Sequence, residues 1–214
     1  MTTPKTRYAR ALAQLALLWA GALIAASAWA AGIREEGLLL EAEAWRSEVA
    51  GAPSADWPVD GWYRLSLADR SVEVRKARPS NPEDADPDNS FYVRVPGARL
   101  KEGLRPKYRF SDLIVKPAIG KQYELMLGKT HFSFTALSDE EGTQFSISYG
   151  GETYLYPLGL PAADTLIHAV ADLDADAMPD FLVEVGGELY LLLSTRATPG
   201  TNVPSAKLLA MGGC

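Results

Sequence analysis

Hydrophobic and polar positions alternate along much of the chain from Trp62 onward. Residues 62–67 place Tyr63, Leu65 and Leu67 on one face, and residues 71–77 continue the alternation after a short turn. A period of two is typical of strands that are buried on one face. The same reading gives further strands at 91–95, 112–116, 121–127 and 131–136. The pattern predicts a mostly β domain, as an antiparallel sandwich or an irregular two-sheet assembly.

Two Gly-Gly dipeptides, at 150–151 and 186–187, each separate two short apolar runs. Such a loop adopts the positive φ angles of a tight hairpin turn. We therefore expect two similar hairpins in one sheet system, formed by residues 144–149 with 152–156 and by 181–185 with 188–193. The implied register pairs Ile147 with Tyr154, Phe145 with Tyr156, Val183 with Tyr190 and Phe181 with Leu192.

The second hairpin is apolar on both faces, because leucines occupy the positions opposite Phe181, Val183 and Val185. A strand pair of this kind is expected to be covered on both sides. Residues 33–51 fit either a short helix, which we favour, or a strand, and residues 52–61 are rich in turn formers. The expected organisation has three parts: a leader at 1–30, an N-terminal segment with its connection at 31–61, and a β domain at 62–214.

Residues 1–30 have the pattern of a secretory signal peptide. Lys5, Arg7 and Arg10 precede an uncharged apolar stretch that ends in Ala28-Trp29-Ala30, which is a small-x-small cleavage site. An uncleaved membrane anchor is the alternative, since about 20 apolar residues can span a bilayer. Cleavage predicts a periplasmic or secreted protein without stable membrane insertion.

The net charge limits the classes of partner, and the cysteine content limits the sources of stability. The chain carries a net charge of −6, and removing the basic leader makes it more negative, which argues against nucleic acid as a partner. The single cysteine, Cys214, excludes an intramolecular disulfide, so the core or a bound ion must supply the stability.

The candidate chemistry lies in a run of aspartates just before the second hairpin. Asp172, Asp174, Asp176 and Asp180 occupy positions 1, 3, 5 and 9 of the stretch DLDADAMPD, and Met178 at position 7 offers its carbonyl. Ligands that are all oxygen suit Ca²⁺ better than Mg²⁺ or Zn²⁺. The alternative is a solvated acidic turn without a metal. A second acidic run, Asp84, Asp86 and Asp88, reads as an exposed loop.

This stretch resembles the D-x-D-x-D-G-x-x-D calcium loop of FG-GAP and VCBS-type β proteins. The resemblance implies that the four aspartates are side-chain ligands and that Met178 adds a backbone oxygen. Ala177 stands where the family has glycine, and the twelfth position, Val183, excludes an EF-hand. The closing segment, from YLLLSTRATPG to GGC, also resembles exported bacterial proteins that carry one such loop.

No nucleophile elbow, phosphate loop, dinucleotide fingerprint or zinc-protease helix occurs in the sequence. The function favoured is therefore a non-enzymatic exported module, stabilised by Ca²⁺, that binds a protein or carbohydrate partner. Trp57 and Trp62 are candidate surface anchors for it. The alternatives are a periplasmic hydrolase using Asp or Glu with His168, which nearby carboxylates would hold protonated, and a structural subunit without metal.

Overall fold

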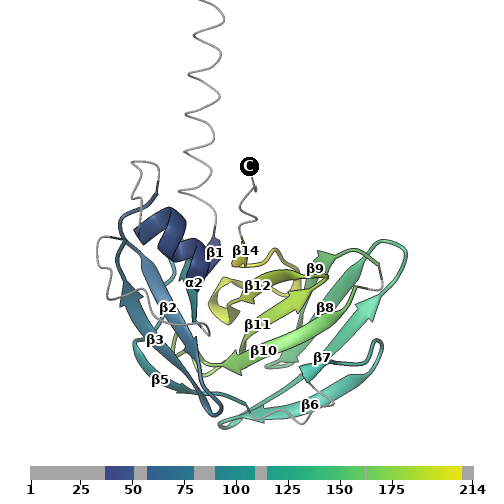
Figure 1. Ribbon diagram of the computed structural model, residues 1–214. Coiled ribbons are helices and arrows are strands. Elements are labelled where there is room, and N and C mark those ends of the chain that lie inside the picture. Colours follow the sequence, from purple (N-terminus) through teal and green to yellow (C-terminus); the bar gives the residue numbers. More distant parts are fainter. Residues whose placement is uncertain (1–36, 51–56, 80–89, 109–114, 162, 209–214) are drawn as a thin grey trace, which may run out of the picture. The chain divides into compact units, whose positions relative to one another are not determined.

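The computed structural model describes residues 37–50, 57–79, 90–108, 115–161 and 163–208, which form two β-sheets (Figure 1). The predictions for residues 1–30, for Asp84–Asp88 and for Cys214, and most of the strand expected at 112–116, lie outside these residues. In the described part of the chain no helix is long and apolar enough to cross a membrane.

The larger sheet has nine strands in the order β10-β11-β12-β14-β1-β4-β2-β3-β5. Their bounds are β1 Leu38–Glu41, β2 Trp62–Leu67, β3 Ser71–Ala77, β4 Ser90–Arg94, β5 Gly103–Pro106, β10 Thr165–Ala171, β11 Asp180–Val185, β12 Glu188–Leu192 and β14 Ala206–Leu208. Just beyond β5, Lys107 bridges to Ala171 on β10, and the Tyr108 amide donates to the Val170 carbonyl at 2.9 Å. The two edges of the sheet therefore meet, and it is nearly closed.

The smaller sheet has five strands in the order β13-β9-β8-β7-β6. Their bounds are β6 Gln122–Leu127, β7 Thr130–Ser138, β8 Thr143–Tyr149, β9 Glu152–Gly159 and β13 Gly200–Thr201. Pairing is antiparallel except between β1 and β14 and between β9 and β13, which are parallel. The structure confirms the prediction of a mostly β, irregular two-sheet assembly.

Two apolar cores share the strands β10, β11 and β12, which lie between β6–β9 and the strands β2, β3 and β5 in Figure 1. Phe181, Val183 and Val185 face the first core, with the smaller sheet. Leu182, Leu189 and Leu191 face the second core, inside the nine-stranded sheet. The prediction that this hairpin is covered on both faces is confirmed, because each alternate position meets a different core.

Both Gly-Gly hairpins have the expected register, including Ile147 opposite Tyr154 and Val183 opposite Tyr190. Their glycines take positive φ angles of 62° and 86° at 150–151 and of 62° and 85° at 186–187. One expectation was wrong: the hairpins belong to different sheets. Apolar residues of both line the first core, so the similar patterns reflect two walls of one core.

The N-terminal segment combines the two structures that its pattern allowed. Strand β1 leads directly into α2, Ala42–Ala44, and a π-helical turn, Trp45–Ala50. Trp45 stacks on Tyr92 with 4.3 Å between ring centroids and meets the edge of Trp62. Trp62 is 1% exposed, so its interpretation as a surface anchor was wrong: its ring fills this cluster and its indole N–H donates to the Pro58 carbonyl at 2.8 Å.

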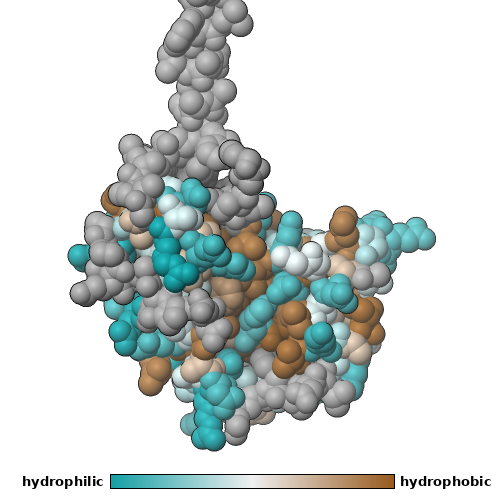
Figure 2. All heavy atoms as spheres, viewed as in Figure 1, coloured by the Kyte–Doolittle hydropathy of each residue, from teal (hydrophilic) through white to brown (hydrophobic). Residues whose placement is uncertain are grey.

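Apolar and polar side chains are interspersed on the face drawn in Figure 2. The most exposed apolar residues, Val59, Leu104, Leu160 and Val203, come from separate parts of the chain. Leu160 and Val203 follow the paired strands β9 and β13, whereas Leu104 lies on β5 of the other sheet. Single exposed apolar side chains are ordinary on protein surfaces.

Candidate metal centre

The aspartate-rich loop joins β10 to β11 and is folded by its own side chains. Both carboxylate oxygens of Asp172 accept backbone amides, from Asp176 at 3.0 Å and from Ala177 at 3.2 Å. Asp176 Oδ1 accepts the Met178 amide at 2.7 Å. Short acidic side chains commonly stabilise turns in this way. The 1-3-5 spacing therefore has a structural consequence before any ion is considered.

Two alanines in this loop lie in the left-handed region, Ala175 with φ 69° and Ala177 with φ 67°. They are the only non-glycine residues with positive φ in the described part of the chain. The resemblance placed a glycine at position 177, and the structure shows why: this conformation costs alanine about 1 kcal/mol. The same conformation at Ala175 has no counterpart in the sequence pattern.

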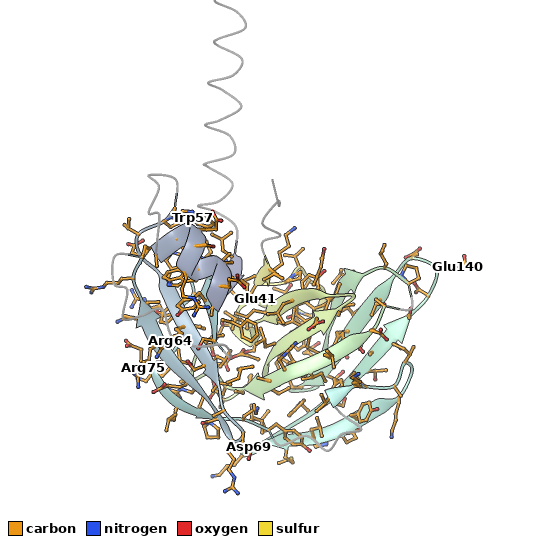
Figure 3. All side chains as sticks on the ribbon, in the orientation of Figure 1. Glu41, Trp57, Arg64, Asp69, Arg75 and Glu140 are labelled. Atoms are coloured by element: carbon orange, nitrogen blue, oxygen red, sulfur yellow. The ribbon has the colours of Figure 1, made fainter. Side chains whose placement is uncertain are left out.

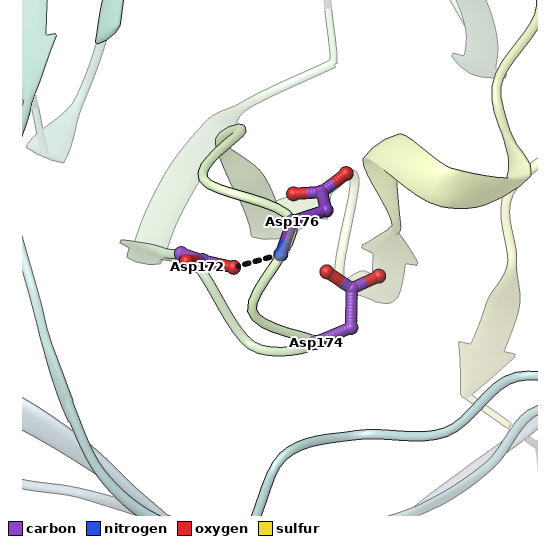
Figure 4. A group of neighbouring side chains, drawn as sticks. All are labelled: Asp172, Asp174 and Asp176. Atoms are coloured by element: carbon purple, nitrogen blue, oxygen red, sulfur yellow. Dashed lines mark hydrogen bonds between the residues drawn. The ribbon is translucent and has the colours of Figure 1, made fainter. Parts of the chain in front are cut away.

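Three carboxylates meet at the centre of the loop, as Figure 4 shows: those of Asp172, Asp174 and Asp176. One oxygen from each lies within 4.8 Å of the others. Within the residues that the structure describes, no lysine, arginine or histidine forms an ion pair with any of the three. Three like charges at this separation repel one another unless a cation or protons intervene.

Asp174 has the most constrained environment of the three. Its Oδ2 accepts the Thr195 hydroxyl, whereas its Oδ1 is buried and has no hydrogen-bond partner. Burial raises the pKa of Asp174, the Asp176 and Asp172 charges add to that rise, and the Thr195 hydrogen bond opposes it. A buried carboxylate oxygen without a donor is unfavourable in a metal-free site and is a natural ligand for a cation.

Asp180 lies outside this group of three and is more deeply buried than its members. It is 1% exposed, and it accepts the Leu173 amide at 2.7 Å, the Ser194 amide at 2.8 Å and the Ser194 hydroxyl at 2.9 Å. Burial, with the nearby Asp174 charge, raises its pKa well above the ordinary value, and the three hydrogen bonds oppose this. Asp180 therefore ties both ends of the loop to the residues that follow β12.

Ser194 and Thr195, in the short 3₁₀ turn Ser194–Arg196, were missed by the sequence reasoning. The Ser194 hydroxyl lies 2.7 Å from Asp176 Oδ2 and 2.9 Å from Asp180 Oδ1. Thr130 at the start of β7 donates to the Ala177 carbonyl at 2.6 Å. These partners lie 14 to 47 residues along the chain from the loop residues that they contact, so only the folded structure brings them there.

Met178 was expected to supply a carbonyl ligand. Its side chain packs partly buried against the first core, and its amide donates to Asp176. The prediction that Met178 and Asp180 are ligands stays a prediction.

Neither histidine contacts the aspartate loop through a hydrogen bond or an ion pair in the described residues. His168 occupies a bulge in β10, and its Nε2 lies 2.9 Å from Glu184 Oε2 on β11. His131 pairs in the same way with Glu124, at 2.8 Å, on the exposed surface of β7 and β6. The carboxylate beside His168 is therefore that of Glu184. The sequence had suggested an aspartate of the loop instead.

The residues of the loop fit a hard divalent cation, since every available donor is an oxygen and one of them lacks a partner. A β-rich fold with three clustered aspartates fits a metal-binding β protein. The choice of ion rests on the chemistry of these donors. No protein family, curated protein or solved structure matches the chain.

Proposed function

We propose that the chain is an exported β module whose loop at 172–180 binds one Ca²⁺ as a structural ion, and that it binds a protein or carbohydrate partner. The observation that supports metal binding most strongly is the buried Oδ1 of Asp174, which has no hydrogen-bond partner and lies among three carboxylates. The signal-like residues 1–30 support export, and the resemblance to calcium-loop proteins supports Ca²⁺ as the ion.

Calcium is favoured by the chemistry of the donors. Ca²⁺ accepts six to eight oxygen ligands in flexible geometry, and its radius suits carboxylates that a loop backbone holds apart. Mg²⁺ requires a stricter octahedron and retains its waters. Because two alanines bear left-handed strain, we expect weak binding, with a Kd of ~10⁻⁴–10⁻³ M, as in extracellular modules.

The ion would act by joining three parts of the fold. The loop itself continues into β11, Asp176 and Asp180 are bonded to Ser194 after β12, and Thr130 of β7 holds the Ala177 carbonyl. Neutralising the carboxylates removes their repulsion while keeping these hydrogen bonds. Ion binding is then coupled to the stability of the hairpin that both cores share.

The hydrolase alternative has less support. A general base needs access to a substrate, and His168 is engaged with Glu184 and stands edge-on to Phe91, with 5.9 Å between ring centroids. The pocket beside Asp174, lined by Tyr63, Lys76 and residues 99–102, contains neither His168 nor Glu184. We therefore retain the binding module as the proposed function.

Titration calorimetry of the full chain with Ca²⁺ and with Mg²⁺ tests the proposal. We expect one Ca²⁺ per chain with a Kd of ~10⁻⁴–10⁻³ M, and at least about tenfold weaker binding of Mg²⁺. Asp174→Asn should abolish the calcium heat, because it removes a charged ligand but keeps an oxygen to accept from Thr195.

The matched control is Asp139→Asn. Asp139 accepts the Glu141 and Gly142 amides in the exposed turn between β7 and β8, outside the loop. It should leave calcium binding unchanged. Equal loss in both variants, or no calcium heat with the unaltered chain, would mean that the acidic loop is a metal-free turn.

A further inference from the structure

A pocket of about 470 Å³ lies beside the aspartate loop. Asp174 forms part of its wall, and the remaining wall comes from Tyr63 on β2, Lys76 on β3 and the segment 99–102 between β4 and β5. Pockets of roughly 300–1,000 Å³ are the size that holds small ligands.

Three of the lining side chains are cationic, although the whole chain is acidic: Lys76, Arg99 and Lys101. Lys76 is neutralised by Glu102, with 2.9 Å between Nζ and Oε1. The side chains of Arg99 and Lys101 form no hydrogen bond or ion pair with any residue that the structure describes. Asp174 in the same wall offsets only one of these two charges, so the lining still favours an anionic group, and the planar arginine fork suits a carboxylate or phosphate.

The segment that carries these cations is fixed in place. The Lys101 amide donates to the Leu173 carbonyl, inside the aspartate loop, at 2.8 Å. On its other side the Arg105 guanidinium donates to the Lys101 carbonyl at 3.1 Å. Leu100 between the cations is buried in the second core. The basic wall of the pocket is therefore attached directly to the candidate metal loop.

We propose that this pocket binds a small anionic ligand through a carboxylate or phosphate group, with Arg99 and Lys101 holding that group. Tyr63 and Leu100 supply the apolar part of the wall. Resting on the proposed function, a Ca²⁺ ion in the loop strengthens this binding, because it cancels the negative charge of Asp174 beside the anion. The pocket thereby specifies the chemistry of a carbohydrate partner as acidic.

The test titrates the full chain with galacturonate, glucose 6-phosphate and neutral glucose, in chelator and in about 10 mM Ca²⁺, which is well above the expected Kd. We expect one of the two anions to bind, and glucose to bind at least about tenfold more weakly. Calcium should raise the affinity for that anion. The two anions separate a carboxylate ligand from a phosphate ligand.

Arg99→Gln should lower the affinity for the anion about tenfold, the value of one charge-assisted hydrogen bond. The matched control is Arg75→Gln, at a residue on β3 that Figure 3 labels. Arg75 is next to Lys76 in the strand, so its side chain lies on the opposite face, where it pairs with Glu73 at 2.6 Å. The control should change the affinity less than about twofold.

The outcomes separate this inference from the proposed function. If an anion binds in chelator and Arg99→Gln removes that binding, the anion pocket is supported, even if calorimetry finds no Ca²⁺ site. Binding that is equal in chelator and in Ca²⁺ overturns the coupling alone. The pocket is overturned if neither anion binds in either condition, or if Arg99→Gln and Arg75→Gln bind equally well.

Discussion

Replacing Asp180 with alanine is expected to lower the free energy of unfolding by about 3–5 kcal/mol, measured by urea denaturation. The substitution leaves the Leu173 and Ser194 amides without their acceptor, in a region where Asp180 itself is 1% exposed. Each buried N–H that loses its partner costs about 1–3 kcal/mol. Loss of the Asp180 carboxylate also frees the junction between the loop and the turn after β12.

Two controls define the origin of this loss. Asp180→Asn keeps one acceptor oxygen, so it should lower the free energy of unfolding clearly less than Asp180→Ala does. Asp139→Ala also removes a carboxylate that accepts two backbone amides, but in an exposed turn where water replaces it, so we expect a loss below about 1 kcal/mol. Similar losses of unfolding free energy for Asp180→Ala and Asp139→Ala would contradict the account of Asp180 as a buried acceptor that joins the loop to the turn after β12.

Truncating either of two neighbouring residues on β11 is expected to be costly, although their side chains point to opposite faces. Phe181→Ala should lower the free energy of unfolding by about 3–5 kcal/mol and Leu182→Ala by about 2–5 kcal/mol. Phe181 is fully buried and meets the edges of Phe132 and Phe134, each with 5.8 Å between centroids. Leu182 is 2% exposed in the second core.

A strand that is buried on one face tolerates truncation at every second position, so the pair of variants distinguishes the two arrangements. Leu104→Ala on β5, where the side chain is 68% exposed, is the control and should change stability by less than about 0.5 kcal/mol. A loss below about 1 kcal/mol for either Phe181→Ala or Leu182→Ala would show that β11 does not separate two cores.

The hairpins could be predicted from the sequence because their determinants are local. Gly-Gly at 150–151 and 186–187 fixes the turn, and the turn fixes the register of every pair that follows. The assignment of the hairpins to different sheets could not be predicted, since it depends on which apolar face packs on which. The same limit applies to β1 and β14, a parallel pair formed by segments at opposite ends of the fold.

The site was predictable to the same extent. The spacing of Asp172, Asp174 and Asp176 identified the three carboxylates that the fold brings together. Asp180 shares the spacing but is not one of these three, because the buried start of β11 directs its carboxylate to Leu173 and Ser194. Partners contributed by distant strands, and the cationic segment 99–102, leave no local pattern in the sequence.

Thermal unfolding of the full chain, in chelator and in about 10 mM Ca²⁺, tests the structural role of the ion most directly. With a Kd of ~10⁻⁴–10⁻³ M this concentration stabilises the chain by about 1.4–2.7 kcal/mol, which corresponds to a rise in Tm of about 3–10 °C. Asp174→Asn should show no rise in calcium. In chelator it should melt at or above the Tm of the unaltered chain, because burial and neighbouring carboxylates already disfavour the Asp174 charge. No rise for the unaltered chain, or an equal rise for Asp174→Asn, would contradict a calcium ion held by these aspartates.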